Sequence, residues 1–257
     1  MRRSFTIIFI PLLMMLGPSE GPGAGNAGPA GQSGSERWTV WDGIYTDAEA
    51  ENGWYTYSSA CSRCHGDVLE GGSAPALTGN HFLESWREDT LESLFAVMKT
   101  MPPRGSPLDD RSGLDVLGYI LQANGYPAGG YRLSTSTLET VWIEGANGPQ
   151  PVPDRSLVEV VGCMTQVEGD EWILTMASQP VRTRKSDRAT REELNEAETK
   201  PLGNNQFRLQ NFYMLGSFDP DRYEGHKMQA KGALIRNSGG DRISLTALGM
   251  VAEGCGQ

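Results

Sequence analysis

Two cysteines and one histidine stand close together in the first half of the chain, in the run Cys61-Ser62-Arg63-Cys64-His65. On a helix, residues three apart share a face, so both thiols could add to the two vinyl groups of one porphyrin. His65 follows on the same turn, where its imidazole could coordinate the iron from the tethered side. This C-x-x-C-H spacing is the attachment sequence for c-type haem, and it predicts one haem bound covalently through Cys61 and Cys64.

The same spacing of thiols has two other uses. A zinc half-site would need further Cys or His ligands nearby, and the only other histidines of the chain are His81 and His226. A redox dithiol of the thioredoxin kind would need a βαβ surrounding, which the flanking sequence does not suggest. Haem attachment is favoured over both alternatives.

The iron of such a haem needs a second axial ligand, unless it is open to small molecules. Met101 offers a soft thioether within Lys99-Thr100-Met101-Pro102-Pro103, where the prolines would stiffen the loop. Met98 is a competitor, but its spacing from Leu91 and Leu94 favours a core residue. His81 is the third candidate. We predict His65 and Met101 as the iron ligands.

The chain around this motif has the patterning of a small helical domain. Residues 47–57 follow Thr46, a good helix N-cap, and carry acidic side chains in their first turn. Apolar residues recur at helical spacing over 89–100 and again over 114–121. Glycine and proline pairs between these stretches indicate loops. This block of the chain is therefore predicted to be all-α.

The pattern changes after residue 155. Apolar residues alternate or cluster between turn signals, which predicts short β-strands over 157–162, 171–175, 207–209, 227–235 and 243–250. Five such strands suggest a small barrel or sandwich. The predicted fold is therefore multidomain, with an all-α domain followed by a small all-β domain.

The N-terminus has the features of an export signal. Arg2 and Arg3 precede an apolar stretch that is too short to span a bilayer comfortably, and a leader rich in Gly, Ala, Pro and Ser follows. We expect a periplasmic or otherwise exported protein, which would meet a membrane only through an uncleaved N-terminal segment or through a partner. The expected division is a signal peptide and flexible leader (1–35), a helical domain (36–128), a linker (129–155) and a small β-barrel domain (156–257).

Residues 38–128 resemble a class I cytochrome c domain. Besides the haem motif, Gly53 and Tyr57 are similar to the Gly-x-x-x-aromatic pattern of that family's first helix, and Tyr119 matches the aromatic residue at the crossing with the last helix. The paired prolines after Met101 and the extension before the first helix resemble the cytochrome modules that accompany bacterial quinoprotein dehydrogenases and respiratory complexes.

The run Pro75-Ala76-Leu77 resembles the Pro-x-Leu of the loop beneath the haem in this family. The resemblance implies that the carbonyl of Pro75 accepts a hydrogen bond from the ring of His65, which would orient that ligand. It also places Leu77 among the residues that contact the haem.

The resemblance implies one-electron transfer by a His/Met-ligated haem, with no open position for a substrate. No catalytic constellation appears, so an electron carrier is expected rather than an enzyme, with the β domain as a docking module. The alternatives are a cytochrome subunit of a periplasmic dehydrogenase or of a membrane-bound electron-transfer complex, and a haem sensor whose methionine leaves the iron. Expected partners are redox proteins: a dehydrogenase, an oxidase or a membrane complex.

The β block carries two cysteines and a basic run. Cys163 falls near the end of the first predicted strand and Cys255 follows the last, so in an exported protein we expect a disulfide between them rather than two buried thiols. The basic run 182–188 precedes several glutamates, which is typical of a solvated loop or short helix. The block resembles small OB-like domains of bacterial exported proteins, which implies a five-stranded barrel.

Composition and charge narrow the possible partners. The 257 residues are 38% hydrophobic and 21% charged, which excludes a multi-span membrane protein and argues against wholesale disorder. The net charge is -10, so nucleic acid would be repelled over most of the surface. Residues 36–128 hold 14 acidic and 6 basic side chains, a net charge of -8. Most of the negative charge therefore belongs to the helical domain and limits which partners can approach that domain.

Overall fold

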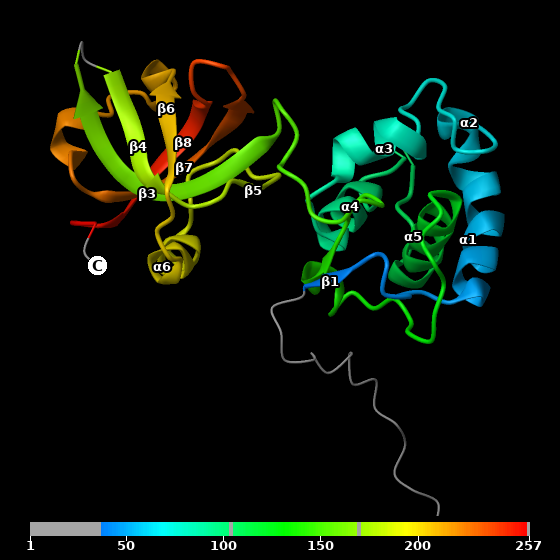
Figure 1. The fold of residues 1–257 in the computed structure, drawn as a ribbon. Helices are drawn as coiled ribbons and strands as arrows, with labels where there is room; N and C mark the ends of the chain where they lie inside the picture. Colours follow the sequence, from blue (N-terminus) through cyan, green and yellow to red (C-terminus); the bar gives the residue numbers. More distant parts are fainter. Residues whose placement is uncertain (1–36, 103–104, 169–170, 256–257) are drawn as a thin grey trace, which may run out of the picture. The chain divides into compact units, whose positions relative to one another are not determined.

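The structure is a computed structural model that describes residues 37–102, 105–168 and 171–255. Helices occupy the N-terminal part of this chain and a β-sheet the C-terminal part, as predicted (Figure 1). The predicted signal peptide and leader, residues 1–35, lie outside the described residues. Among the described helices, none is long and apolar enough to cross a membrane.

The helical region is built from α1 (Asp47–Ala60), α2 (Ser62–His65), α3 (Gly79–Trp86), α4 (Leu91–Met98) and α5 (Asp110–Ala123). The starts of α1, α4 and α5 are fixed by side chains that accept from free backbone N–H groups. Thr46 and Glu49 form a capping box at α1, Thr90 caps α4, and Asp109 caps α5. The three helices predicted from the sequence correspond to α1, α4 and α5, with shifted ends.

Helices α1 and α5 lie side by side, and a glycine sets how closely they approach (Figure 1). A Cβ atom on Gly53 would lie 1.9 Å from the carbonyl oxygen of Asp115 and 2.9 Å from Cβ of Tyr119, so a larger residue forces the helices apart. The rings of Tyr57 and Tyr119 pack beside this crossing with centroids 5.3 Å apart. Their contact spans the two helices.

The segment expected to be a linker, 129–155, is partly built into the helical core. Leu138, Val141 and Ile143 are buried among the apolar side chains of the helices. Strand β2 (Val141–Trp142) pairs in parallel with β1 (Trp38–Thr39), which precedes α1. Burying these apolar side chains is more favourable than leaving them exposed in a linker. The helical region therefore extends to about residue 145.

The β region is a sheet of six strands: β3 (Leu157–Val167), β4 (Glu171–Ala177), β5 (Val181–Arg182), β6 (Asn205–Gln210), β7 (Lys227–Ile235) and β8 (Arg242–Ala252). Their order is β4-β6-β8-β7-β3-β5, with an additional pairing of β4 with β3. The long strand β3 pairs with β7 through its first residues and with β4 through its last (Figure 1). The pairings β3–β4–β6–β8–β7–β3 thus return to the strand on which they begin.

Helix α6 (Arg191–Thr199), which lies between β5 and β6 in the chain, is tied to the sheet by charges. Lys231 on β7 is 1% exposed, and its ammonium lies 2.9 Å from a carboxylate oxygen of Glu193. Lys200, which caps the end of α6, pairs with Glu159 on β3. A buried lysine of this kind is stable only when a carboxylate faces it.

A disulfide joins Cys163 on β3 to Cys255, which follows β8. The two positions are separated by 92 residues in the chain. The bond therefore ties the first strand of the sheet to the segment that follows its last strand.

Candidate haem site

The C-x-x-C-H run forms a single helical turn directly after α1. Cys61 ends α1 and also caps α2, and its carbonyl accepts hydrogen bonds from the N–H groups of Cys64 and His65 at 3.1 and 3.0 Å. This geometry places the two cysteines one turn apart. Both thiols are free, Cys61 being half-buried and Cys64 exposed, and burial raises the pKa of Cys61, with a further contribution from Cys64.

The loop after α2 folds back and orients His65. Nδ1 of His65 lies 2.8 Å from the carbonyl oxygen of Pro75. Backbone hydrogen bonds from Gly71 N–H to the His65 carbonyl (2.7 Å) and from Ala74 N–H to the Cys64 carbonyl (3.0 Å) hold the loop in place. A proton on Nδ1 leaves the lone pair of Nε2 free for a metal.

Two further residues of this loop support the turn. Leu77 donates its N–H to the carbonyl of Leu69 at 2.9 Å, and its half-buried side chain packs against the helical core. The hydroxyl of Tyr57 donates to the carbonyl of Gly66, directly after His65, at 2.7 Å. Burial raises the pKa of Tyr57, so this hydroxyl stays protonated and remains a donor. Tyr57 was singled out in the sequence for its ring, whereas its hydroxyl bond has no local sequence signal.

The methionines at the end of α4 differ in their surroundings. Met98 is half-buried and packs against the helical core, as its spacing predicts. Met101 lies three residues later with its side chain 37% exposed, and its N–H donates to the Met98 carbonyl at 3.0 Å. His81, the third candidate, is exposed on α3. Of the two methionines at the end of α4, Met101 is therefore the exposed one.

Two apolar side chains a few positions along the chain from candidate ligands are exposed. Val68 in the loop after His65 is 70% exposed, and Val97 on the last turn of α4 is also exposed. Two free thiols and an imidazole held through Nδ1, all on one helical turn, are the donors that covalent haem attachment and iron binding use. Among the described residues, no group of three or more His, Cys, Asp or Glu side chains is arranged to hold a metal ion.

The comparison with known families agrees with this geometry. Residues 48–120 match the family model described as cytochrome C oxidase, cbb3-type, subunit III. The match supports a c-type cytochrome domain in this part of the chain. The match includes the C-x-x-C-H turn, the Pro75 loop and Met101, and it spans less than a third of the chain. No curated protein is significantly similar to the chain.

A cytochrome c domain implies haem binding and electron transfer through that haem. The family model ends before the β region, so the match gives that region no function. The family description names a subunit of an oxidase.

Proposed function

We propose that the protein is a one-electron carrier that holds a single haem c through thioether bonds to Cys61 and Cys64, with His65 and Met101 as the axial ligands. The observation that carries this proposal is the 2.8 Å contact between His65 Nδ1 and the Pro75 carbonyl. It fixes the ring and its tautomer on the turn that bears both free thiols, as a haem ligand requires.

The bound haem would supply reversible one-electron redox chemistry at its iron. The chain's residues determine where that chemistry occurs and at what potential. His65 is held by Pro75, while the Met101 thioether favours the reduced iron and thereby raises the potential. With both axial positions filled by side chains, no position remains for a substrate, which distinguishes a carrier from an enzyme.

We propose that the β region is an OB-like docking module that joins this carrier to its partner. The ring of strand pairings from β3 through β4, β6, β8 and β7 supports a barrel of this kind. Disulfide pairing of Cys163 with Cys255 supports an exported protein, in agreement with the signal-like N-terminus.

A second candidate function is a subunit of a membrane-bound oxidase or of a periplasmic dehydrogenase. The family match to an oxidase subunit favours the first of these. Co-purification of the native holoprotein separates the possibilities. A free monomer supports the shuttle, whereas a stable oxidase or dehydrogenase complex supports the subunit.

The ligand assignment is tested by comparing Met101→Ala with Met98→Ala in the haem-loaded protein. Met101→Ala should lower the midpoint potential by on the order of 0.1 V, a fraction of the ~0.8 V over which axial ligands set haem potentials. It should also let the reduced protein bind carbon monoxide. Met98→Ala should leave both properties near those of the wild type and cost stability through its core contacts. The reverse pattern would assign the ligand to Met98.

Carbon monoxide also tests the sensor alternative. A wild-type reduced protein whose spectrum is unchanged by the gas at neutral pH has a methionine that stays in place, as the carrier requires. Binding by the wild type would favour a sensor.

A further inference from the structure

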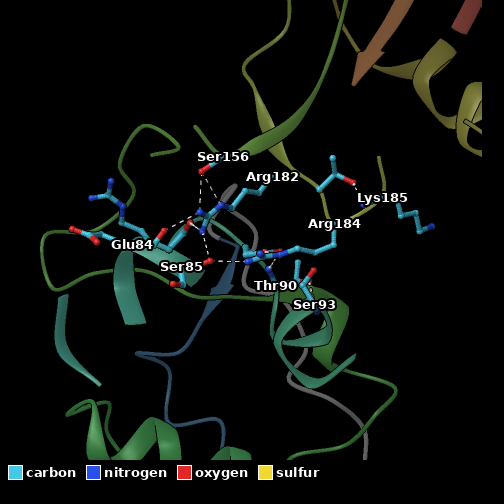
Figure 2. Close-up of polar contacts among 11 residues, drawn as sticks. Glu84, Ser85, Thr90, Ser93, Ser156, Arg182, Arg184 and Lys185 are labelled. Atoms are coloured by element: carbon cyan, nitrogen blue, oxygen red, sulfur yellow. Dashed lines mark hydrogen bonds and ion pairs between the residues drawn. The ribbon is translucent and has the colours of Figure 1, made fainter. Parts of the chain in front are cut away.

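Arg182 on β5 binds the C-terminal end of helix α3. Its guanidinium donates to the carbonyls of Glu84, Ser85 and Arg87 at 2.9, 2.7 and 3.0 Å (Figure 2). Two further bonds, of 3.1 and 2.9 Å, reach Oγ of Ser156. Carbonyls at a helix C-terminus lack intrahelical partners and carry the negative end of the helix dipole, so a cation is favoured there.

Arg184 makes a second attachment two residues further on. It donates to a carboxylate oxygen of Asp89 at 2.8 Å and to the Ser85 carbonyl at 2.7 Å (Figure 2). Its guanidinium carbon also lies 4.3 Å from the centroid of the Trp86 ring. Since the Asp89 side chain is almost completely buried, it would be an unpaired buried charge without Arg184.

The contact of Arg184 with Asp89 lies directly before the helix that leads to Met101. Asp89 precedes Thr90, the N-cap of α4, and also accepts a hydrogen bond from the Thr90 N–H at 2.9 Å. The backbone of Asp89 is held as well, because its carbonyl accepts from Ile143 N–H at 2.9 Å. Helix α4 then runs to Met98, whose carbonyl binds the N–H of Met101.

A short helix transmits displacement of one end to the other, because its backbone hydrogen bonds keep it stiff. At 1.5 Å per residue, the turns from Thr90 to Met98 measure about 12 Å. Met101 lies exposed beyond the far end, and its N–H binds the Met98 carbonyl at the last residue of this helix. The place of its sulfur therefore depends on how firmly the start of α4 is held.

We propose that Arg182 and Arg184 are positioning residues for the axial methionine. They anchor the beginning of α4 to the β region, and this anchor keeps Met101 at the iron. The inference rests on the proposed function for the identity of the ligand. It gives the β region a role inside the carrier, in addition to docking: it stabilises the methionine-ligated state of the haem.

The experiment compares haem-loaded wild type with Arg182→Gln, Arg184→Gln and the double variant. Arg188→Gln is the matched control, since it removes the same charge from the same exposed segment. Amide hydrogen exchange of residues 90–98 should be about tenfold faster in the double variant, in line with the loss of charge-assisted hydrogen bonds. Its midpoint potential should fall towards that of Met101→Ala, and the reduced form should bind carbon monoxide more tightly. Arg188→Gln should match the wild type in all three measurements.

The outcomes separate the two proposals. A Met101→Ala variant with wild-type potential would refute the ligand assignment. If Met101→Ala behaves as expected but the double variant keeps the wild-type potential and carbon monoxide binding, the positioning role is wrong even when α4 exchanges faster. Arg184→Lys keeps a charge opposite Asp89 and guards against misfolding of the stronger variants. An intermediate potential for Arg184→Lys supports the proposal, whereas a value outside the range between wild type and Arg184→Gln contradicts it.

Discussion

The helical and β regions differ in whether their reactive and charged side chains find partners within the same region. The helical region leaves two free thiols at Cys61 and Cys64, and it also exposes the side chains of Val68 and Met101. In the β region, the cysteines are joined to each other and the buried lysine faces a carboxylate. The first region therefore has groups that need a further molecule, while the second has satisfied the corresponding groups internally.

This difference indicates where a cofactor contributes to stability. A group that binds only the folded form adds its binding free energy to that form. Haem should therefore stabilise the helical region strongly. It should stabilise the β region only through the contacts between the two regions. Variants that damage one region and spare the other test this comparison.

The largest effect is expected from the double substitution Cys61→Ser, Cys64→Ser. The protein should lose covalently bound haem, and the helical region should lose more than about 4 kcal/mol, the stabilisation that a ligand gives at a thousand times its Kd. Haem staining after denaturing electrophoresis and hydrogen exchange resolved by region provide the measurements. Equal destabilisation of both regions would contradict the comparison.

The double substitution Cys163→Ser, Cys255→Ser should instead destabilise the β region. Loss of a bond that closes a loop of 92 residues should cost the β region about 4 kcal/mol through loop entropy. The midpoint potential of the haem should stay unchanged while the β region remains folded. Titration of the unfolded, unreduced holoprotein should detect no free thiol in the wild type, and two reactive thiols there would refute the pairing.

The helix crossing provides a smaller and more local test. Gly53→Ala should destabilise the helical region by about 1–3 kcal/mol, because the new Cβ would overlap the Asp115 carbonyl. Gly118→Ala is the matched control on α5, where the nearest atom to a new Cβ lies 3.5 Å away. It should be neutral or stabilising by up to about 1 kcal/mol, the helix propensity gained over glycine. Chemical denaturation followed by the haem absorption distinguishes the two, and similar values would rule out the close crossing.

The last test concerns the acid dependence of the β region. Hydrogen bonds from Lys185 and Lys231 lower the pKa of Glu193 to about 2. Since this folded value lies below the unfolded one of about 4.3, the stability that Glu193 contributes is present above pH ~4.3 and is lost as the pH falls towards 2. Its size should be about 1–3 kcal/mol, because the Lys185 pair is near the surface while the Lys231 ammonium is buried against the same carboxylate.

Glu193→Gln should therefore be less stable than the wild type at pH 6 and lose less stability on acidification to pH 3. Glu192→Gln removes the same charge from the neighbouring exposed position, and its acid dependence should follow that of the wild type. Denaturant midpoints of the β region at the two pH values measure the effect. If the denaturant midpoint changes by the same amount between the two pH values in both glutamine variants, Glu193 does not contribute to the acid dependence.

The parts of the fold that could be predicted are those encoded by neighbouring residues. The helical turn at Cys61–His65 follows from one short motif, and the capping of α1 follows from Thr46 and the acidic residues after it. The alternating apolar pattern of β7 likewise marks a strand without reference to the rest of the chain. In each case, the cause lies within a few positions of the effect.

The parts that could not be predicted depend on residues far apart in the chain. The basic run 182–188 has the pattern of a solvated segment, yet Arg182 and Arg184 bind residues that lie 95 to 99 positions earlier. Ile143 falls in a stretch whose glycines and prolines indicate a linker, and it is buried in the helical core. Local patterns give no signal for such partners, because the partners come together only when the chain has folded.

The position of β8 in the sheet has a consequence for the order of events during folding. This strand pairs with both β6 and β7, and it is among the last described segments of the chain. As a chain emerges N-terminus first, the helical core can be complete once residue 143 is free, whereas the sheet lacks its central strand until about residue 252. In that interval β6 and β7 present open edges, which are prone to pair with other chains. The cytochrome domain thus has time to fold first, and the sheet is at greatest risk of misassembly until its final strand arrives.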